Sequence, residues 1–250
     1  MNVADFQRFC TDYDVQPIVL SRDRASVLPT HTDKLLRNYI LFYSGDGYTE
    51  LELRGAVDRI EVPRELRGRS VVANYALRML DNRFVIILGD DAKDIVWLGE
   101  DKLRRIDAEG VMVMTVNMVI NAIDTGAGLF GISEVDIRKA SPLEPFHTRR
   151  MVTGFVGLDR HKLPPIWFDE RQVLKEDYDF CLEHLKRDRF VLKDLRYFYS
   201  QDRNVLPGGN MGLRTPEREE HEVENLKDWW GDDMVRFTDG RQTKHLRIIV

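Results

Sequence analysis

The segment FVIIL at 84–88 is an unbroken run of large apolar residues. A short run of this kind, without polar alternation, is typical of a strand buried on both faces of a largely parallel sheet. Such a strand needs helices on both faces, so the chain is restricted to an α/β architecture. The residues just before it, SVVANYALRMLDN at 70–82, predict one of these helices, with Ser70 as its N-cap. Its predicted apolar face consists of Val72, Tyr75, Ala76, Met79 and Leu80.

Further strands and helices are predicted from apolar runs that end at charged or glycine-rich turns. The predicted strands are QPIVLSRDRA from 16, NYILFYS from 38, VDRIEVP from 57, TGFVGLD from 153 and RFVLKDLRYFYS from 189. A short helix is expected near Thr32. A longer one follows Gln172, with an apolar face of Tyr178, Cys181, Leu182 and Leu185 and the acidic residues opposite. The segment 110–133 mixes helical and strand periods, and its methionines indicate core packing. The acidic segment 215–233 is typical of a solvated helix.

Composition excludes several classes of function. The formal charge of −5 argues against a surface built for nonspecific polyanion binding, although short basic stretches occur at 160–162 and 186–189. The two cysteines, Cys10 and Cys181, have no metal-binding or disulfide spacing. The first residues lack the pattern of a signal peptide, and no apolar run has membrane-spanning length. We therefore expect a cytoplasmic protein, and no membrane partner.

Asp90 and Asp91 directly follow the buried strand, where ligand sites of open α/β sheets are found. Carboxylates suit Mg2+ or Mn2+, whose remaining ligands are commonly phosphate oxygens and water. The pair is therefore a candidate metal site that would also hold a nucleotide diphosphate. A charged turn after a strand is the alternative explanation. Asp94 adds a third carboxylate nearby in sequence.

Two further sets of charged residues have both structural and functional explanations. Glu176 and Asp177 lie where a helix should begin; acids in a first turn favour the helix dipole, but one of them could also act as a general base. Arg22 and Arg24 end the first strand, where they would contact phosphate or form surface ion pairs. The glycines of PGGNMG at 207–212 suit a flap over a ligand or an ordinary turn.

The order of these segments resembles the GT-A glycosyltransferases. The residues that carry the resemblance are PIVLSRDRA, SVVANYALRMLDNRFVIILGDD, LKEDYDFCLEHL and YFYSQDRNVLPGG. Within that fold the arrangement is most similar to the TET-associated glycosyltransferases of phages and bacteria, over roughly residues 16–214. The resemblance implies a GT-A-like, Rossmann-like mixed sheet, mainly parallel and flanked by helices. It also implies one domain over 1–250, with a nucleotide-sugar half at 16–98, an acceptor half at 99–214 and a C-terminal extension at 215–250.

The resemblance also implies roles for individual residues. Asp91 would be the principal metal ligand, and Asp90 a second ligand or a contact to the sugar nucleotide. Asp177 or Glu176 would be the catalytic carboxylate, and Arg22 and Arg24 would lie near the nucleotide. Related sequences often have three acids in a row, whereas Gly89 stands in the first place here, with Asp94 as a candidate substitute. His221 and His245 are weak candidates for a third metal ligand.

The implied reaction is transfer of a sugar from a nucleoside diphosphate sugar, expected to be a UDP-sugar, to an acceptor hydroxyl with Mn2+ or Mg2+. The resemblance further implies DNA with hydroxymethylated pyrimidine as the acceptor, in the cytoplasm of a host cell if a phage encodes the protein. Basic stretches at 160–162, 186–189 and 241–247 would follow the DNA backbone, and Trp167, Trp229 and Trp230 would stack on bases. Two alternatives remain: a metal-dependent nucleotidyltransferase, and a noncatalytic module that binds nucleotide sugar or nucleic acid.

Overall fold

The computed structural model describes residues 1–99, 102–134, 145–162, 164–201, 206, 208–232, 234–239 and 244–248. Side chains of 133, 134, 211, 236–239 and 244–248 are not described. The strands are β1 (Val15–Arg22), β2 (Tyr39–Ser44), β3 (Ala56–Glu61), β4 (Phe84–Gly89), β5 (Ala92–Leu98), β6 (Leu103–Ile106), β7 (Leu129–Glu134), β8 (Phe146–His147), β9 (Val156–Asp159), β10 (Leu192–Gln201), β11 (Val235–Asp239) and β12 (Lys244–Ile248). The helices are α1 (Val3–Asp12), α2 (Thr32–Leu35), α3 (Arg69–Met79), α4 (Ala108–Thr125), α5 (Glu176–Asp188) and α6 (Pro216–Trp230), with short 3-10 turns at Leu28–Thr30 and Met211–Leu213.

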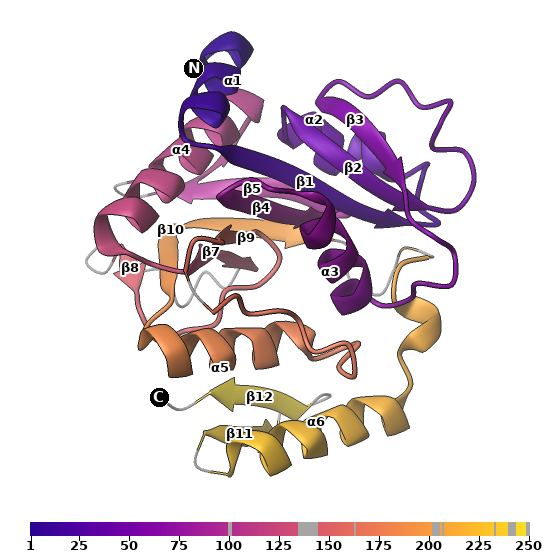
Figure 1. Cartoon of the computed structure of the whole chain (residues 1–250), viewed down its shortest axis with the longest axis vertical. Helices are drawn as coiled ribbons and strands as arrows, with labels where there is room; N and C mark the ends of the chain where they lie inside the picture. Colours follow the sequence, from indigo (N-terminus) through magenta and orange to yellow (C-terminus); the bar gives the residue numbers. More distant parts are fainter. Residues whose placement is uncertain are drawn as a thin grey trace.

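A mixed sheet of ten strands forms the centre of the molecule (Figure 1). Its order is β3-β2-β1-β4-β9-β7-β10-β5-β6, and β8 pairs with β10. Strands β1 to β4 are mutually parallel, whereas β5, β8 and β9 run against their neighbours. The expected α/β fold with a mainly parallel sheet is therefore confirmed, and one sheet runs through both predicted halves of the chain.

The apolar run at 84–88 is buried on both faces, as predicted. Phe84, Ile86 and Leu88 pack with α1, α2 and α4 on one face of the sheet. Val85 and Ile87 alternate with them and pack with α3 and α5 on the opposite face. Because strand side chains alternate, only a strand with helices over both faces buries every one of these residues.

The sheet is strongly curved between β4 and β5. These strands are consecutive in the chain, yet β9, β7 and β10 lie between them in the sheet. In a flat sheet they would be about 19 Å apart. Asp90 and Asp91 alone connect them, a link that spans at most about 11 Å. The sheet must therefore curl, which brings the start of β5 to the end of β4 above α2. Thr32 joins the two, since its hydroxyl donates to Gly89 O at 2.6 Å and accepts from Ala92 N at 3.2 Å.

The predicted helix at 70–82 exists, and part of its predicted face is confirmed: Ala76 and Leu80 are buried, and Val72 and Tyr75 are partly buried against the same core. The residues of α3 that are buried are Ser70, Ala73, Asn74, Ala76 and Leu77. Met79 is 50% exposed. The N-cap is Gly68, not Ser70, because Ser70 Oγ donates to Gln172 O at 2.8 Å instead of capping the helix. Asn74 exchanges hydrogen bonds with the backbone of Phe168, at 2.8 and 3.1 Å. Polar tertiary contacts therefore set the face of α3, which apolar periodicity does not detect.

The ambiguous segment 110–133 divides into α4 and β7 at Gly126, the C-cap of α4. Met112, Met114 and Met118 are buried, so their predicted core role is confirmed. The sequence patterns missed α1, β5 and β6. They also misjudged two amphipathic helices: Glu176 and Asp179 of α5 are buried, and α6 buries Glu222, Val223 and Leu226 instead of being only solvated.

The helix α6 and the hairpin β11-β12 lie against α5, at the end of the molecule opposite α1 (Figure 1). Leu182 of α5, Leu226 of α6 and Val235 of β11 form a small separate core. Among the described residues, no helix combines the length and apolar character needed to cross a membrane.

Candidate active site

The strand order contains a switch point between β1 and β4. The chain adds β2 and β3 on one side of β1 and then places β4 on the other side. Ligand sites of open α/β sheets lie at such a switch point, outside the carboxyl ends of the two strands. Ser21 and Arg22 end β1, and Gly89 ends β4, so Arg24 and the pair Asp90-Asp91 follow at this point.

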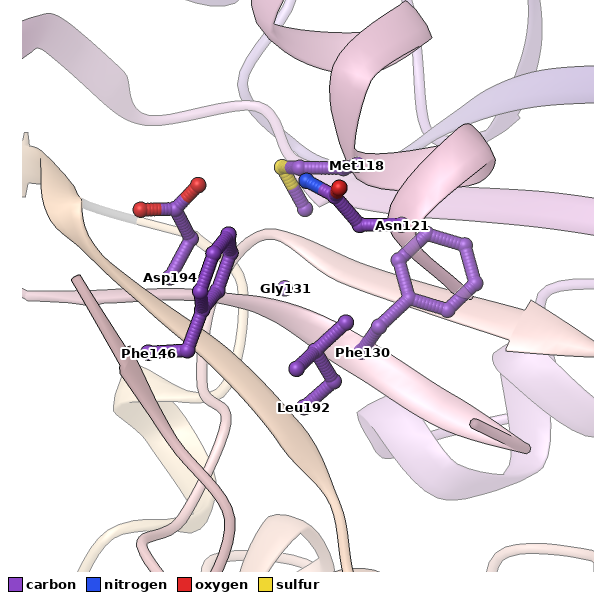
Figure 2. A pocket seen from close by; sticks show the side chains of 7 residues that line it. All are labelled: Met118, Asn121, Phe130, Gly131, Phe146, Leu192 and Asp194. Carbon is purple, nitrogen blue, oxygen red and sulfur yellow. The ribbon is translucent and has the colours of Figure 1, made fainter. Parts of the chain in front are cut away.

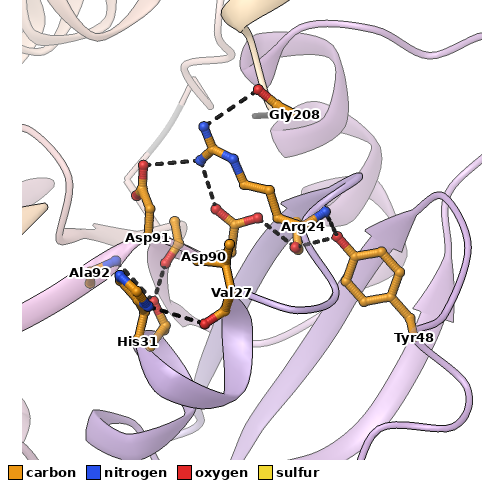
Figure 3. A network of polar contacts seen from close by, with 11 residues as sticks. Arg24, Val27, His31, Tyr48, Asp90, Asp91, Ala92 and Gly208 are labelled. Carbon is orange, nitrogen blue, oxygen red and sulfur yellow. Dashed lines mark hydrogen bonds and ion pairs between the residues drawn. The ribbon is translucent and has the colours of Figure 1, made fainter. Parts of the chain in front are cut away.

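Arg24 links the two aspartates (Figure 3). Its Nη1 lies 3.1 Å from Asp90 Oδ1 and 3.0 Å from Asp91 Oδ2. The side chain of Asp90 is almost fully buried, whereas that of Asp91 is 19% exposed. A guanidinium between two carboxylates offsets the repulsion of adjacent negative charges. The predicted pair is therefore an organised cluster and not a solvated turn.

Asp90 is fixed by a buried chain of hydroxyl groups. Ser21 Oγ donates to Asp90 Oδ2 at 2.5 Å and lies 2.6 Å from the hydroxyl of Tyr48. That hydroxyl accepts from the backbone N–H of Arg24 at 2.8 Å. Burial raises the pKa of Asp90 to about 6, although the Arg24 charge acts in the opposite direction. The carboxylate of Asp90 is consequently held in one orientation by Ser21 and Arg24 at the end of β1, which Tyr48 contacts in turn.

The donor set fits a divalent cation. Two carboxylates at a strand end are the hard oxygen ligands that Mg2+ and Mn2+ prefer, and the Arg24 guanidinium shows that the pair accommodates positive charge. Asp91 is the more accessible of the two carboxylates. Among the described residues there is no group of three or more His, Cys, Asp or Glu side chains that could hold a metal. His221 lies on α6 with its Nε2 3.5 Å from Asn225, and the side chain of His245 is outside the described part.

Asp94 and Arg22 are engaged elsewhere in the structure. Asp94 lies within β5, where its carboxylate is 3.8 Å from Lys34 Nζ and 3.6 Å from Arg105 Nε. The guanidinium of Arg22 donates to Leu66 O at 2.9 Å and Arg64 O at 3.2 Å, which ties β1 to the loop before α3. Their suggested contacts with a nucleotide or sugar remain predictions.

Glu176 and Asp177 occupy the first turn of α5, as predicted. Arg69, at the start of α3, places its Nη1 3.4 Å from Glu176 Oε1. The Arg69 Nη2 atom is buried and has no hydrogen-bond partner within the described part of the chain. Burial of Glu176 and the charge of Asp177 together raise the Glu176 pKa to about 7, against the lowering by Arg69. A carboxyl group with this pKa can both accept and release a proton near neutral pH.

The glycine-rich loop connects the aspartate pair to the start of α5. Gly208 O accepts from Arg24 Nη2 at 3.4 Å (Figure 3), and Gly209 N donates to Arg22 O at 3.0 Å. The next residue is Asn210, whose Nδ2 donates to Val173 O at 3.1 Å. The loop therefore bridges Arg24, the partner of the acidic pair, and the segment before Glu176. Pro207 is outside the described residues.

A small hollow lies elsewhere, between α4 and strands β7 and β10 (Figure 2). Its cavity volume is only about 10 Å³, room for about one water molecule, and its lining is mostly apolar. Its carboxylate, Asp194, is paired with Arg196 at 2.7 Å. The hollow therefore lacks the free charged groups that a phosphate or metal ligand requires.

Sequence patterns missed Ser21, Tyr48 and Arg69 as members of the site. Ser21 reads as part of an apolar strand, and Tyr48 belongs to a loop 42 residues before Asp90. A signal was present for Arg69, because a cation at the start of a helix opposes the helix dipole and so suggests an anionic partner.

The fold is that of the GT-A glycosyltransferases, and solved structures illustrate the likeness. Glucosyl-3-phosphoglycerate synthase from Mycobacterium tuberculosis, solved with Mn2+, UDP-glucose and phosphoglyceric acid, has a TM-score of 0.54 and 12% identity, covering 100% of this chain and 92% of that one. A mycobacterial protein has a TM-score of 0.55 and 13% identity over 99% and 87% of the two chains. S. aureus TarS has a TM-score of 0.50 and 10% identity over 86% and 64%. At these identities the likeness defines the fold and not the substrate.

Neither a protein-family model nor a curated protein matches the chain.

Proposed function

We propose that this chain transfers a sugar from a nucleoside diphosphate sugar, most plainly a UDP-sugar, to an acceptor hydroxyl. The observation that most directly supports this function is the organised pair Asp90-Asp91 at the switch point between β1 and β4. Two comparisons support the choice of donor: the mycobacterial synthase of the same fold was solved with UDP-glucose and Mn2+, and also with UDP and Mg2+. Neither of the two alternative functions, a nucleotidyltransferase or a noncatalytic binding module, receives comparable support from these comparisons.

In this proposal Asp91 is the principal ligand of Mn2+ or Mg2+, and Asp90 is its second ligand or a contact to the donor. The cation, when bound, stabilises the negative charge that develops on the departing diphosphate. Arg24 lies beside both carboxylates and supplies a second positive charge for the phosphates. Asp94 and Arg22 flank this centre and remain candidates for donor contacts.

Glu176 is the proposed general base, with Asp177 beside it. Its pKa of about 7 suits removal of a proton from an acceptor hydroxyl at neutral pH. A base that activates the acceptor for direct displacement gives inversion at the anomeric carbon. The anomeric configuration of the product, read by NMR, therefore tests this role; a retained configuration contradicts it.

For the acceptor we propose 5-hydroxymethylpyrimidine in DNA, which follows from the resemblance to TET-associated glycosyltransferases. Exposed tryptophans support a stacking surface. Trp167 is 39% exposed, with the Arg78 guanidinium over its ring, and Trp229 is 37% exposed, with the Arg171 guanidinium over its ring. Trp230 is less available, because its Nε1 donates to Asp179. Residues 241–243 of the basic stretch lie outside the described part. DNA affinity that falls steeply with salt supports this acceptor, and binding that is absent or independent of salt contradicts it.

A thermal-shift panel tests the donor. It compares UDP, UDP-glucose, other nucleoside diphosphate sugars and UTP, each with and without Mn2+. A ligand at about a hundred times its dissociation constant stabilises the folded state by about 2.7 kcal/mol. We expect stabilisation by a diphosphate or its sugar only with Mn2+. Stabilisation by triphosphates alone would favour a nucleotidyltransferase, and donor binding without turnover would favour a noncatalytic module.

A further inference from the structure

The segment Gln172–Lys175, immediately before Glu176, is held by a carboxylate from the C-terminal helix α6. Glu222 Oε2 accepts hydrogen bonds from three consecutive backbone N–H groups, those of Val173 at 3.0 Å, Leu174 at 2.7 Å and Lys175 at 3.0 Å. Glu222 itself is 1% exposed. A buried carboxylate that gathers three amides fixes their positions strongly, because each bond to an ionised acceptor is stronger than a neutral one.

We call Glu222, with the three amides that it accepts from, the Glu222 clamp. Further contacts hold the Glu222 carboxylate in its orientation. Arg218, one turn earlier on α6, places its Nε 3.3 Å from Glu222 Oε1, so the second carboxylate oxygen is also engaged. The Glu222 backbone carbonyl accepts from Gln172 Nε2 at 3.2 Å. Every acceptor group of Glu222 in these contacts therefore points to the same segment or to the arginine that orients the carboxylate.

Other elements hold the same segment from different sides. Ser70 of α3 donates to Gln172 O at 2.8 Å, and Asn210 of the glycine-rich loop donates to Val173 O at 3.1 Å. Ser70 is adjacent to Arg69, the partner of Glu176. The start of α5 is thus defined by α3, the loop and α6 together, and α6 provides the only one of these anchors that is charged.

We propose that Glu222 is a positioning residue for sugar transfer, which fixes the start of α5 so that Glu176 and Asp177 meet the acceptor hydroxyl in the correct geometry. This role rests on the proposed function. Glu222 touches neither Asp90 nor Asp91 in the described contacts, so it acts on the acceptor side and not on donor binding. A displacement of about 1 Å at a reacting group can lower a rate about a hundredfold.

The test separates turnover from donor binding. The variants are Glu222→Gln, which removes the charge with little change of shape, and Glu224→Gln, an exposed glutamate on the same helix. UDP release from UDP-glucose with Mn2+ and hydroxymethylated DNA as acceptor, or nucleoside diphosphate release from the donor found in the panel, gives kcat, and calorimetry with UDP and Mn2+ gives Kd. We expect Glu222→Gln to lower kcat at least about tenfold with Kd changed less than about twofold. Glu224→Gln should match the wild type.

A folded Glu222→Gln variant with wild-type kcat would overturn the role of Glu222 and leave the proposed function intact. So would a parallel loss of UDP affinity and kcat, since this indicates a general loss of structure. If Glu222→Gln does not fold, Arg218→Gln tests the same clamp with the three amide bonds preserved; lowered kcat at unchanged Kd supports the role, and unchanged kcat overturns it. A wild-type chain that turns over no nucleoside diphosphate sugar overturns the proposed function, and the role of Glu222 with it.

Discussion

Arg24 Nη1 lies 3.0 Å from Asp91 Oδ2, so the more exposed member of the acidic pair already has a cation beside it. A divalent metal that binds this carboxylate must share it with the guanidinium or displace it. The relationship makes the metal affinity of the site a property of three side chains and not of the aspartates alone.

Asp91→Asn should abolish the Mn2+-dependent stabilisation by UDP, because a neutral amide is a much weaker ligand for a hard cation than a carboxylate. Melting temperatures with UDP, with and without Mn2+, measure the effect. Asp124→Asn, at an exposed position on α4, is the matched control and should respond like the wild type. A full UDP and Mn2+ shift in Asp91→Asn would contradict the assignment of Asp91.

Arg24→Gln should lower the melting temperature in the absence of metal, since Asp90 and Asp91 then repel each other without a counter-charge. Mn2+ alone should then raise the melting temperature more than it does in the wild type, because no guanidinium competes for the carboxylates. Arg105→Gln is the control: its guanidinium pairs with Asp94 and is 77% exposed. A smaller Mn2+ shift in Arg24→Gln would instead show that Arg24 supports metal binding.

The rate of transfer should rise with pH and level off above about 7. The pKa of Glu176 is raised to about 7 by burial and by Asp177, so its carboxyl group keeps its proton below that pH and cannot act as a base. The pH dependence of kcat/KM measures this limb. In Glu176→Gln the rate should fall and the limb centred near pH 7 should disappear; an unchanged profile would exclude Glu176 as the titrating base.

Some parts of this site could be predicted from the sequence, and others could not. The strand 84–88 and the acids behind it were predictable, because an apolar run followed by charge is a local pattern. The start of α5 at Glu176 was predictable for the same reason. The partner of each acid was not: Arg24 precedes Asp90 by 66 residues and Arg69 precedes Glu176 by 107, and such pairs depend on strand order.

The other failures have separate physical causes. β5 and β6 were missed because AKDIVWL and LRRI carry charges; they lie at one edge of the sheet, where most of their side chains are at least partly exposed. Part of the buried face of α3 was missed because Ser70 and Asn74 are buried with hydrogen bonds to 168–172, a segment about a hundred residues away. The buried side of α6 was missed because an isolated glutamate gives no sign that three amides need an acceptor.

Lowering the pH should destabilise the protein through His184. Burial lowers the pKa of this imidazole, against the hydrogen bond with Asp188, and its Nε2 has no partner among the described residues. The unfolded chain therefore takes up the proton first, so this contribution to stability is present above about pH 6.5 and is lost as the pH falls below it. Urea unfolding at pH 7.5 and 5.5 measures it.

His184→Gln should lose less stability between those two pH values than the wild type does, because glutamine has no proton to gain. His161→Gln, at an exposed position after β9, should lose as much as the wild type. Comparison between variants is needed, since Asp90 and Glu176 have raised pKa values and act with the opposite sign. Equal losses in all three proteins would contradict the role assigned to His184.

Gly154→Ala should destabilise the fold by more than about 2 kcal/mol, from strained backbone and overpacking together. Gly154 has φ of +79°, and a Cβ atom there would lie 2.0 Å from Tyr199 Cζ. Gly212→Ala is the control, because among the described residues, its chain neighbours aside, no heavy atom lies within 4 Å of the added Cβ. Urea unfolding of both variants measures the difference; a Gly154→Ala protein as stable as Gly212→Ala would show that Tyr199 moves freely.

The two residues between β4 and β5 serve as a tether of fixed length. Since they join strands that lie far apart in sheet order, one inserted residue would loosen the curl, and one deleted residue would pull β4 or β5 out of register with its neighbours. Substitutions there change charge, whereas insertions and deletions change shape. Engineering of this chain should therefore tolerate side-chain exchange at 90 and 91 far better than any change in loop length, and a library that varies length there should yield few folded members.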